Sequence, residues 1–431
     1  MKRYLFLLAA LLLFEKSVFA QQTREVEAKG FGINREDALQ DALRNAVSSA
    51  AGVAVVAETN MENFIVVRDA VATKSSGYVA GYDVLSEKPG ANYEMNIKAR
   101  VSLDPLKADI TLLTRAIGGV RFLVMFDERG LSKPEAEQLD FAAERLNAGL
   151  AERKYRYIER SRYQALRREA SNMMEASDTS ELSYVQRLGM LADAQFIILV
   201  KKASINSRSE AFDTRTSSRV VLEVKAYDNC TAEGLGTVLM ESDWKNAREA
   251  DAAIRNGLQE AISKDLNKLL NVFNSYIGDW VNNGTPFELR FYQTGTFRDF
   301  RDLRTRLKSD TDFGGQMEFT SVNNFTKLNC TFKNTADDLA YKILDFADAI
   351  PGFKEKVLDV KLIYGRQISF APQRVIVPEL KKPADSPTTT NTPANSTVTP
   401  AKSASPTKTN TTSKPSSTKK PATSSKPKPK K

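Results

Sequence analysis

The chain has 431 residues and no His, so it lacks every catalytic or metal site that needs an imidazole. Its two Cys are too few for a Cys-rich zinc site. The net charge of +9 is concentrated at the C-terminus, because residues 381–431 hold eleven Lys and one Asp and residues 1–380 carry about −1. The rest of the chain therefore offers no overall basic field for nucleic acid.

The first 20 residues have the pattern of an export signal. Lys2 and Arg3 precede an apolar run that ends at Phe14, and Val18-Phe-Ala20 supplies the small residues that a signal peptidase reads. The run is shorter than the ~20 residues that a membrane helix needs. We predict a signal peptide over 1–20 and a mature chain in the periplasm or on the periplasmic face of the outer membrane, with no transmembrane helix after the signal is removed.

Residues 21–104 predict a first small α/β domain. Asn34, with Asp37 three residues later, is a predicted helix N-cap, and Gly52 is the predicted end of that helix. The helix has many Ala, which would let it lie close to a sheet. A second helix is expected over 61–74. The alternation over 93–101 predicts a half-buried strand.

Residues 119–284 predict a second α/β domain. An apolar strand over 121–126 is followed by a helix capped at Ser132, a strand over 155–160 and a helix over 163–174. A helix then leads into a strand that ends at Val200. A hairpin is expected from 219–226 and 237–240, and a long amphipathic helix over 246–280 closes the domain.

Residues 285–372 predict a third domain with the order β-α-β-β-α-β, which is the ferredoxin-like arrangement. Thr296 and Thr335 are the predicted N-caps of its two helices. The predicted fold class is therefore α/β (α+β), with three small domains in series. Asp337, Asp338, Asp345 and Asp348 are interpreted as a solvated helix face, so we predict no metal, cofactor or catalytic residue.

Two stretches resemble known families. Val26-Glu-Ala-Lys-Gly-Phe-Gly, the Ala-rich helix and Gly77-Tyr-Val-Ala-Gly-Tyr resemble the N-terminal domain of the flagellar assembly protein T family. Ile158-Glu-Arg followed by Leu166, and Leu188-Gly-Met-Leu-Ala-Asp-Ala, resemble the periplasmic part of the curli assembly and transport component, which has an anticodon-binding-like α/β pattern. The lipid-bearing Cys of that second family has no counterpart after Ala20. The resemblance implies assembly work in the cell envelope.

Residues 380–431 predict a disordered tail, because they are rich in Lys, Pro, Ser and Thr and have almost no large apolar residue. The tail is either a solvated extension or a tether to peptidoglycan carboxylates or another anionic surface. The candidate tether residues are Lys402, Lys408, Lys414, Lys419, Lys420, Lys426, Lys428, Lys430 and Lys431. Cys230 and Cys330 could pair in an oxidising compartment or remain separate thiols, and the sequence leaves both alternatives open.

We therefore expect a non-enzymatic, exported assembly or stabilising factor that acts through protein–protein contacts. Its expected partners are envelope proteins or further copies of the chain, and no nucleic acid. The alternative, from a different class, is a periplasmic binding or sensing module for a small ligand or peptide. Bound ligand would favour this alternative, whereas a fixed stoichiometry with envelope proteins would favour assembly.

Overall fold

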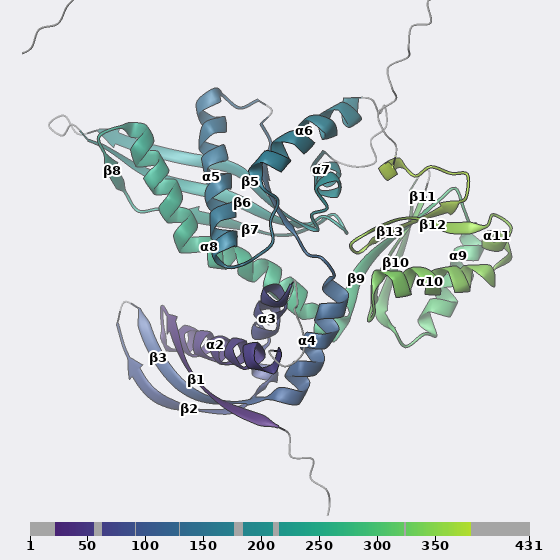
Figure 1. Ribbon diagram of the computed structural model, residues 1–431, viewed down its shortest axis with the longest axis horizontal. Helices are drawn as coiled ribbons and strands as arrows, with labels where there is room; N and C mark the ends of the chain where they lie inside the picture. The colour runs from purple at the N-terminus through teal and green to yellow at the C-terminus, as the bar shows by residue number, and fades with distance from the viewer. Residues whose placement is uncertain are drawn as a thin grey trace, which may run out of the picture. The chain divides into compact units, whose positions relative to one another are not determined.

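The computed structural model describes residues 22–55, 63–90, 92–128, 130–175, 184–209, 215–322 and 325–380. These residues form helices packed on three separate β-sheets, which confirms the predicted mixed α/β class (Figure 1). The predicted signal peptide and residues 381–431 of the predicted tail, with all nine candidate tether lysines, lie outside the described residues.

The N-terminal sheet has three antiparallel strands in the order β1-β3-β2. Its strands are β1 (Thr23–Gly32), β2 (Val79–Lys88) and β3 (Tyr93–Ser102). Helix α2 (Arg35–Val55) lies across one face of this sheet (Figure 1), followed by α3 (Phe64–Ala72) and the short η1 (Ser75–Gly77). Met95, Ile97 and Ala99 of β3 are fully buried, as the predicted alternation requires.

Helix α2 begins where the sequence predicts and ends later. The Asn34 side chain accepts a hydrogen bond from the backbone N–H of Asp37 at 2.9 Å, so the predicted N-cap is confirmed. The predicted end at Gly52 is wrong, since the helix continues to Val55. A glycine within a helix is a cost of about 1 kcal/mol and not an obligatory stop.

A further helix, α4 (Leu103–Ile117), occupies the segment that the sequence analysis left unassigned between its first two domains. Its buried face includes Leu106, Ile110 and Leu113, at i, i+3/i+4 spacing. One core cluster contains buried hydrophobic residues of both of the first two predicted domains, from Ala38 to Trp280, so these two domains share a core.

The middle sheet has the order β4-β5-β6-β7, with β8 also paired to β6. Its strands are β4 (Phe122–Phe126), β5 (Phe196–Ser209), β6 (Thr216–Asp228), β7 (Glu233–Glu241) and β8 (Lys245–Ala247). Only the β4–β5 pair is parallel among these strands. Its helices are α5 (Lys133–Glu152), α6 (Arg160–Glu175), α7 (Tyr184–Ala192) and α8 (Ala250–Asn283).

The predicted strand over 155–160 is wrong. The segment makes only one parallel bridge to β4, between Tyr157 and Phe122, and α6 already begins at Arg160. Tyr155 is buried in the large core cluster, whereas Ile158 joins a second cluster that includes residues of α6 and α7. The side chains of Tyr155 and Ile158 are therefore buried in different cores, and the segment that holds them is not a strand.

The C-terminal sheet has five strands in the order β10-β11-β9-β13-β12. They are β9 (Thr285–Tyr292), β10 (Phe313–Val322), β11 (Phe325–Phe332), β12 (Leu358–Tyr364) and β13 (Gln367–Pro372). Helices α9 (Phe297–Lys308) and α10 (Ala336–Asp348) cover one face, and α11 (Pro351–Lys354) follows them (Figure 1). Capping boxes at Thr296 and Thr335 confirm both predicted N-caps.

The β-α-β-β-α-β order is present, but the four-stranded ferredoxin-like sheet is not confirmed. An extra strand, β13, pairs in parallel with β9 and displaces β12 to the edge. Ile368 and Phe370 of β13 are fully buried, while most of β12 is only half-buried. Strand β13 therefore holds the central, more buried position, and β12 lies at the exposed edge.

The last described segment packs on the sheet through a buried carboxylate. Glu379 lies in η2 (Pro378–Leu380), and its Oε1 accepts hydrogen bonds from Tyr292 Oη at 2.8 Å and Ser369 Oγ at 3.1 Å. Arg290 Nη1 lies 3.1 Å from the same oxygen, and Arg290 also pairs with Glu288 at 2.6 Å. This polar cluster holds the chain just before the predicted tail.

Candidate functional site

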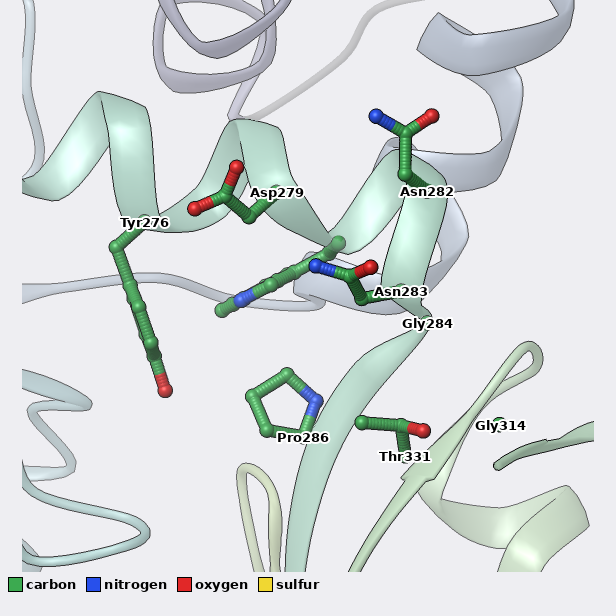
Figure 2. A pocket seen from close by; sticks show the side chains of 9 residues that line it. Tyr276, Asp279, Asn282, Asn283, Gly284, Pro286, Gly314 and Thr331 are labelled. Carbon is green, nitrogen blue, oxygen red and sulfur yellow. The ribbon is translucent and has the colours of Figure 1, made fainter. Parts of the chain in front are cut away.

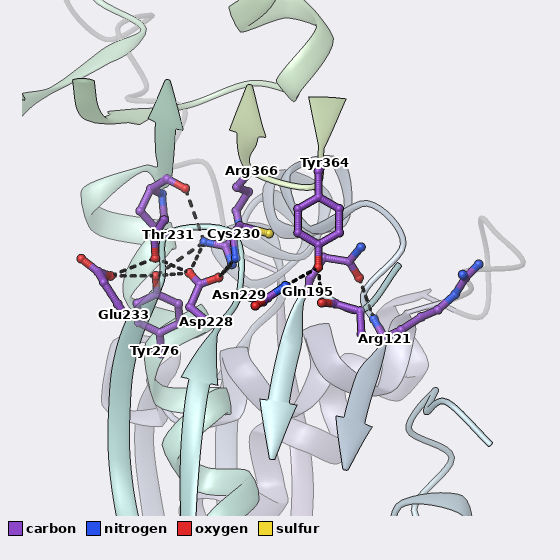
Figure 3. Close-up of polar contacts among 12 residues, drawn as sticks. Arg121, Gln195, Asp228, Asn229, Cys230, Thr231, Glu233, Tyr276, Tyr364 and Arg366 are labelled. Carbon is purple, nitrogen blue, oxygen red and sulfur yellow. Dashed lines mark hydrogen bonds and ion pairs between the residues drawn. The ribbon is translucent and has the colours of Figure 1, made fainter. Parts of the chain in front are cut away.

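The turn between β12 and β13 connects the C-terminal sheet to the middle sheet. It presents Tyr364 and Arg366 to the ends of the middle-sheet strands (Figure 3). Gly365, at φ +53°, lies between them. A Cβ at this position would lie 2.8 Å from Cys230 Sγ and 2.9 Å from Gln195 Cγ, so the turn needs a glycine both for its conformation and for its close approach.

Arg366 and Asp228 form a bidentate ion pair that is buried on both sides. Nη1 and Nη2 of Arg366 each lie 2.6 Å from one carboxylate oxygen of Asp228, and the two side chains are 5 % and 0 % exposed. Two parallel N–H···O bonds are the strongest arrangement of this pair. The partners are 138 residues apart in sequence, at the end of β6 and in the β12–β13 turn.

Neutral groups complete the coordination of the Asp228 carboxylate. Tyr276 Oη donates to it at 2.7 Å, Thr231 Oγ1 at 2.9 Å and the backbone N–H of Cys230 at 3.0 Å. The guanidinium of Arg366 stacks 4.5 Å from the centre of the Trp280 ring. We call Asp228, Tyr276, Trp280 and Arg366 the junction cluster.

The electrostatics of the junction cluster favour the charged pair. Burial, the largest single influence, would lower the pKa of Arg366, but the charge and hydrogen bonds of Asp228 together with Cys230 and Tyr276 outweigh burial, and the net shift is upward. Burial raises the pKa of Tyr276, and the charge of Asp228 adds to that rise. Arg366 is therefore a permanent cation and Tyr276 a neutral hydrogen-bond donor across the physiological pH range.

A cavity of about 480 Å³ adjoins this cluster where α8 ends and β9 begins. We call it the elbow pocket. It is lined by Tyr276, Asp279, Trp280, Asn282, Asn283, Gly284, Pro286, Gly314 and Thr331. Figure 2 shows Asn283 on the side of α8 that faces Pro286 and Thr331, whereas Asn282 points away from them.

Two glycines shape the elbow pocket. Gly284, at φ +79°, ends α8 and donates its N–H to the Trp280 carbonyl at 2.9 Å. A Cβ at Gly314 would lie 1.8 Å from Thr331 Oγ1 and 2.9 Å from the Asn283 carbonyl oxygen. The end of α8 can approach β10 and β11 this closely only because position 314 has no side chain.

One buried polar group beside the elbow pocket has no partner among the described residues. The Trp280 side chain is buried (2 % exposed), and its indole Nε1–H has no acceptor among the described residues. Such an orphaned donor is a cost of about 1–3 kcal/mol unless a ligand or water satisfies it. Asp279, in contrast, is already paired with Lys74 Nζ at 2.5 Å.

The structure keeps Cys230 and Cys330 apart as two free, buried thiols. Cys230 follows β6 beside the β12–β13 turn, while Cys330 faces the core beneath the C-terminal sheet and pairs in register with Phe287. The disulfide alternative is therefore not realised, because the two side chains point into separate environments.

Both thiols are expected to be unreactive in the folded protein. Burial raises the pKa of Cys230 to about 12 and that of Cys330 to about 12, compared with about 8.5 for an unfolded cysteine. Iodoacetamide at about pH 8 should label neither thiol in native protein and both in guanidinium chloride, as read by mass spectrometry. Fast labelling of native protein would contradict the buried placement.

The raised pKa values of Cys230 and Cys330 also predict how these thiols change the stability of the folded state as the pH changes. The neutral thiols bind their protons more tightly in the folded state, so their contribution is full below about pH 8.5 and is lost as the pH rises toward about 12.

Sequence reasoning missed the residues of the junction cluster and the elbow pocket. Asp228, Tyr276 and Arg366 carry no motif, and Arg366 lay beyond the last predicted strand of the third domain. The Asn283-Gly284 pair at the end of a long helical pattern was the available signal, since it marks a helix C-terminus.

Among the residues with described positions, no helix is both long and apolar enough to cross a membrane. The same residues contain no group of three or more Cys, Asp or Glu side chains that could hold a metal ion. The four aspartates of the α10 region lie at or near the helix surface, and Asp338 serves the Thr335 capping box.

The comparisons with known proteins do not assign this chain to a family. No family model matches the chain, and no curated protein is similar to it. The crystal structure of lipoprotein GNA1162 from Neisseria meningitidis is similar over 35% of this chain and 99% of that chain, with 10% identity and a TM-score of 0.24. The structure of the hypothetical protein CT253 from Chlamydia trachomatis is similar over 38% of this chain and 97% of that chain, with 13% identity and a TM-score of 0.20. At these TM-scores neither likeness carries an argument about fold or function.

Proposed function

We propose that the protein is a non-enzymatic cell-envelope assembly or stabilising factor that acts through protein–protein contacts. The observation that supports this most is the junction cluster, where the buried Arg366–Asp228 pair joins the C-terminal sheet to the middle sheet. A protein that closes on its ligand needs a junction that opens and closes. A buried bidentate pair instead favours one fixed arrangement, which suits a scaffold that holds partners at set positions.

A second set of buried contacts, near the same end of the middle sheet, supports the same proposal by joining α3 to α8. Tyr155 Oη lies 2.8 Å from Asp69 on α3 and 3.0 Å from Asn274 Nδ2 on α8. A Cβ at Gly278 would lie 2.8 Å from the Ala70 carbonyl oxygen, so α3 and α8 are in close backbone contact. The resemblance to flagellar and curli assembly proteins points in the same direction.

In-cell crosslinking of the full-length chain, followed by isolation of the envelope fraction, tests the proposal. The matched comparison is a chain that ends at Pro383, the last residue of the compact unit. A shorter chain would remove Glu379 and its contacts, so it would confuse tail loss with unfolding. We expect both chains to capture the same envelope component at a fixed ratio.

Two outcomes count against this proposal. If only the full-length chain captures the component, the Lys-rich segment and not the folded sheets carries the interaction. If neither chain captures a component, the assembly role is excluded. The second candidate, a periplasmic binding or sensing module for a small ligand or peptide, then leads, and the elbow pocket favours it.

A further inference from the structure

We propose that helices α9 and α10 form a docking surface through which a second copy of the chain binds head to tail. This inference rests on the proposed assembly role and names one partner for it. The two helices cover the same face of the C-terminal sheet (Figure 1) and carry opposite charges. Helix α9 has five basic and two acidic residues, a net charge of +3. Helix α10 has one basic and four acidic residues, a net charge of −3.

One side of α9 is basic and includes an exposed aromatic ring. Its residues are separated by four, three and four positions, a spacing that places them on one side of an α-helix. We call them the basic stripe: Phe297, Arg301, Arg304 and Lys308. All four are exposed, and Phe297 is 89 % exposed. Within the described part of the chain, Arg304 and Lys308 have no carboxylate partner, and Arg301 makes only a solvent-exposed contact of 3.4 Å with Asp302.

One side of α10 is acidic and also includes an exposed aromatic ring. Its residues are separated by four, four and three positions, so they too share one side of a helix. We call them the acidic stripe: Asp337, Tyr341, Asp345 and Asp348. All four are exposed, Tyr341 is 71 % exposed, and none of the three aspartates has a cationic partner among the described residues. The one basic residue of α10, Lys342, is already paired with Asp310 and Asp312, at 2.7 Å each.

The two stripes cannot satisfy each other within one chain. Arg306 of α9 and Phe346 of α10 line the same cavity, so these sides of the two helices face each other. Two positions along an α-helix correspond to a rotation of about 200°. The basic stripe, at Arg304, therefore faces away from α10, and the acidic stripe, at Asp348, faces away from α9.

A second copy of the chain matches both stripes. The basic stripe of one copy and the acidic stripe of the next have complementary charges, and each presents an aromatic ring of the kind that is enriched at the centres of protein interfaces. Two different surfaces on opposite sides of one chain give a head-to-tail contact. A Lys-rich segment such as residues 381–431 would match only the acidic stripe, and an anionic surface would match only the basic stripe.

The test removes one stripe at a time from the full-length chain. The first variant carries Phe297→Ala and Arg304→Ala, and the second carries Tyr341→Ala and Asp345→Ala. In analytical ultracentrifugation at low salt, the parent chain should self-associate, and each variant should do so at least about tenfold more weakly. Raising NaCl from about 50 mM to about 500 mM should weaken association of the parent, because salt screens exposed charges.

An equimolar mixture of the two variants distinguishes a head-to-tail contact from a general loss of solubility or charge. Each variant keeps the stripe that the other has lost, so the mixture should form a dimer of the two variants and nothing larger. Arg306→Ala is the matched control, because it removes the same charge from the opposite side of α9. It should leave the association constant within about twofold of the parent value. Circular dichroism should show parental helix content for all variants.

Three outcomes overturn the proposal. The first is a parent chain that stays monomeric at low salt up to about 100 μM. The second is a mixture of the two variants that forms no dimer. The third is association of the full-length chain but not of a chain that ends at Pro383, which would show that the Lys-rich segment occupies the acidic stripe. These measurements use purified protein alone, so failure here leaves capture of envelope components by crosslinking to be decided separately.

Discussion

Replacing Asp228 with Asn is expected to lower the free energy of unfolding by about 3–5 kcal/mol. The substitution keeps the shape of the side chain but leaves the Arg366 guanidinium buried without a counter-charge. Loss of one partner of a buried pair is more costly than loss of the whole pair, because the remaining charge cannot be hydrated. Urea denaturation followed by circular dichroism measures the change.

The matched control is Asp359→Asn on the neighbouring strand β12. Asp359 is 54 % exposed and lies 3.4 Å from Lys361, so its loss should change stability by less than about 0.5 kcal/mol. If the two variants have equal stability, the Arg366–Asp228 pair does not join the two sheets in solution. The support for a rigid scaffold would then be removed.

Replacing Gly30 with Ala is expected to destabilise the protein by about 1–3 kcal/mol. A Cβ at this position on β1 would lie 2.2 Å from the Ala38 carbonyl oxygen and 2.2 Å from the Ala42 nitrogen. Both are backbone atoms of α2, so the helix itself must move away from the sheet. Movement of a packed helix separates the buried Ala and Leu side chains beneath it.

Gly52→Ala is the control for this variant. Gly52 lies within α2, and a Cβ there would meet no atom of the described residues within 4 Å. Alanine is the better helix former by about 1 kcal/mol, so this variant should be as stable as the parent or more stable. A Gly30→Ala protein with parental stability would show that α2 does not lie this close to β1.

The local elements of the fold were largely predictable. The N-caps at Asn34, Ser132, Thr296 and Thr335 are all confirmed, and so is the alternation along β3. These features depend on groups within three or four residues of one another, or on a simple two-residue period. The close packing of the Ala-rich helix on its sheet also follows from composition, since small side chains permit it.

The errors have a common physical cause. The segment 155–160 does not form the predicted strand, because Tyr155 and Ile158 are buried in different cores. Strand β13 was missed because nothing local indicates that Ile368 and Phe370 displace the preceding strand from the centre of the sheet. Strand order depends on which strand gains most from burial on both faces, and this is decided among distant segments.

The residues of the candidate site could not be predicted from sequence patterns for the same reason. Asp228 and Arg366 are 138 residues apart, and the elbow pocket combines the end of one helix with three strands. By itself the sequence determined the α/β class, the helix starts, the absence of His chemistry and the concentration of positive charge in the last 51 residues. Those properties depend on composition and on neighbours in the chain. Only the tertiary structure decided which buried charges meet and where the elbow pocket forms, because burial and pairing arise from contacts between segments far apart in sequence.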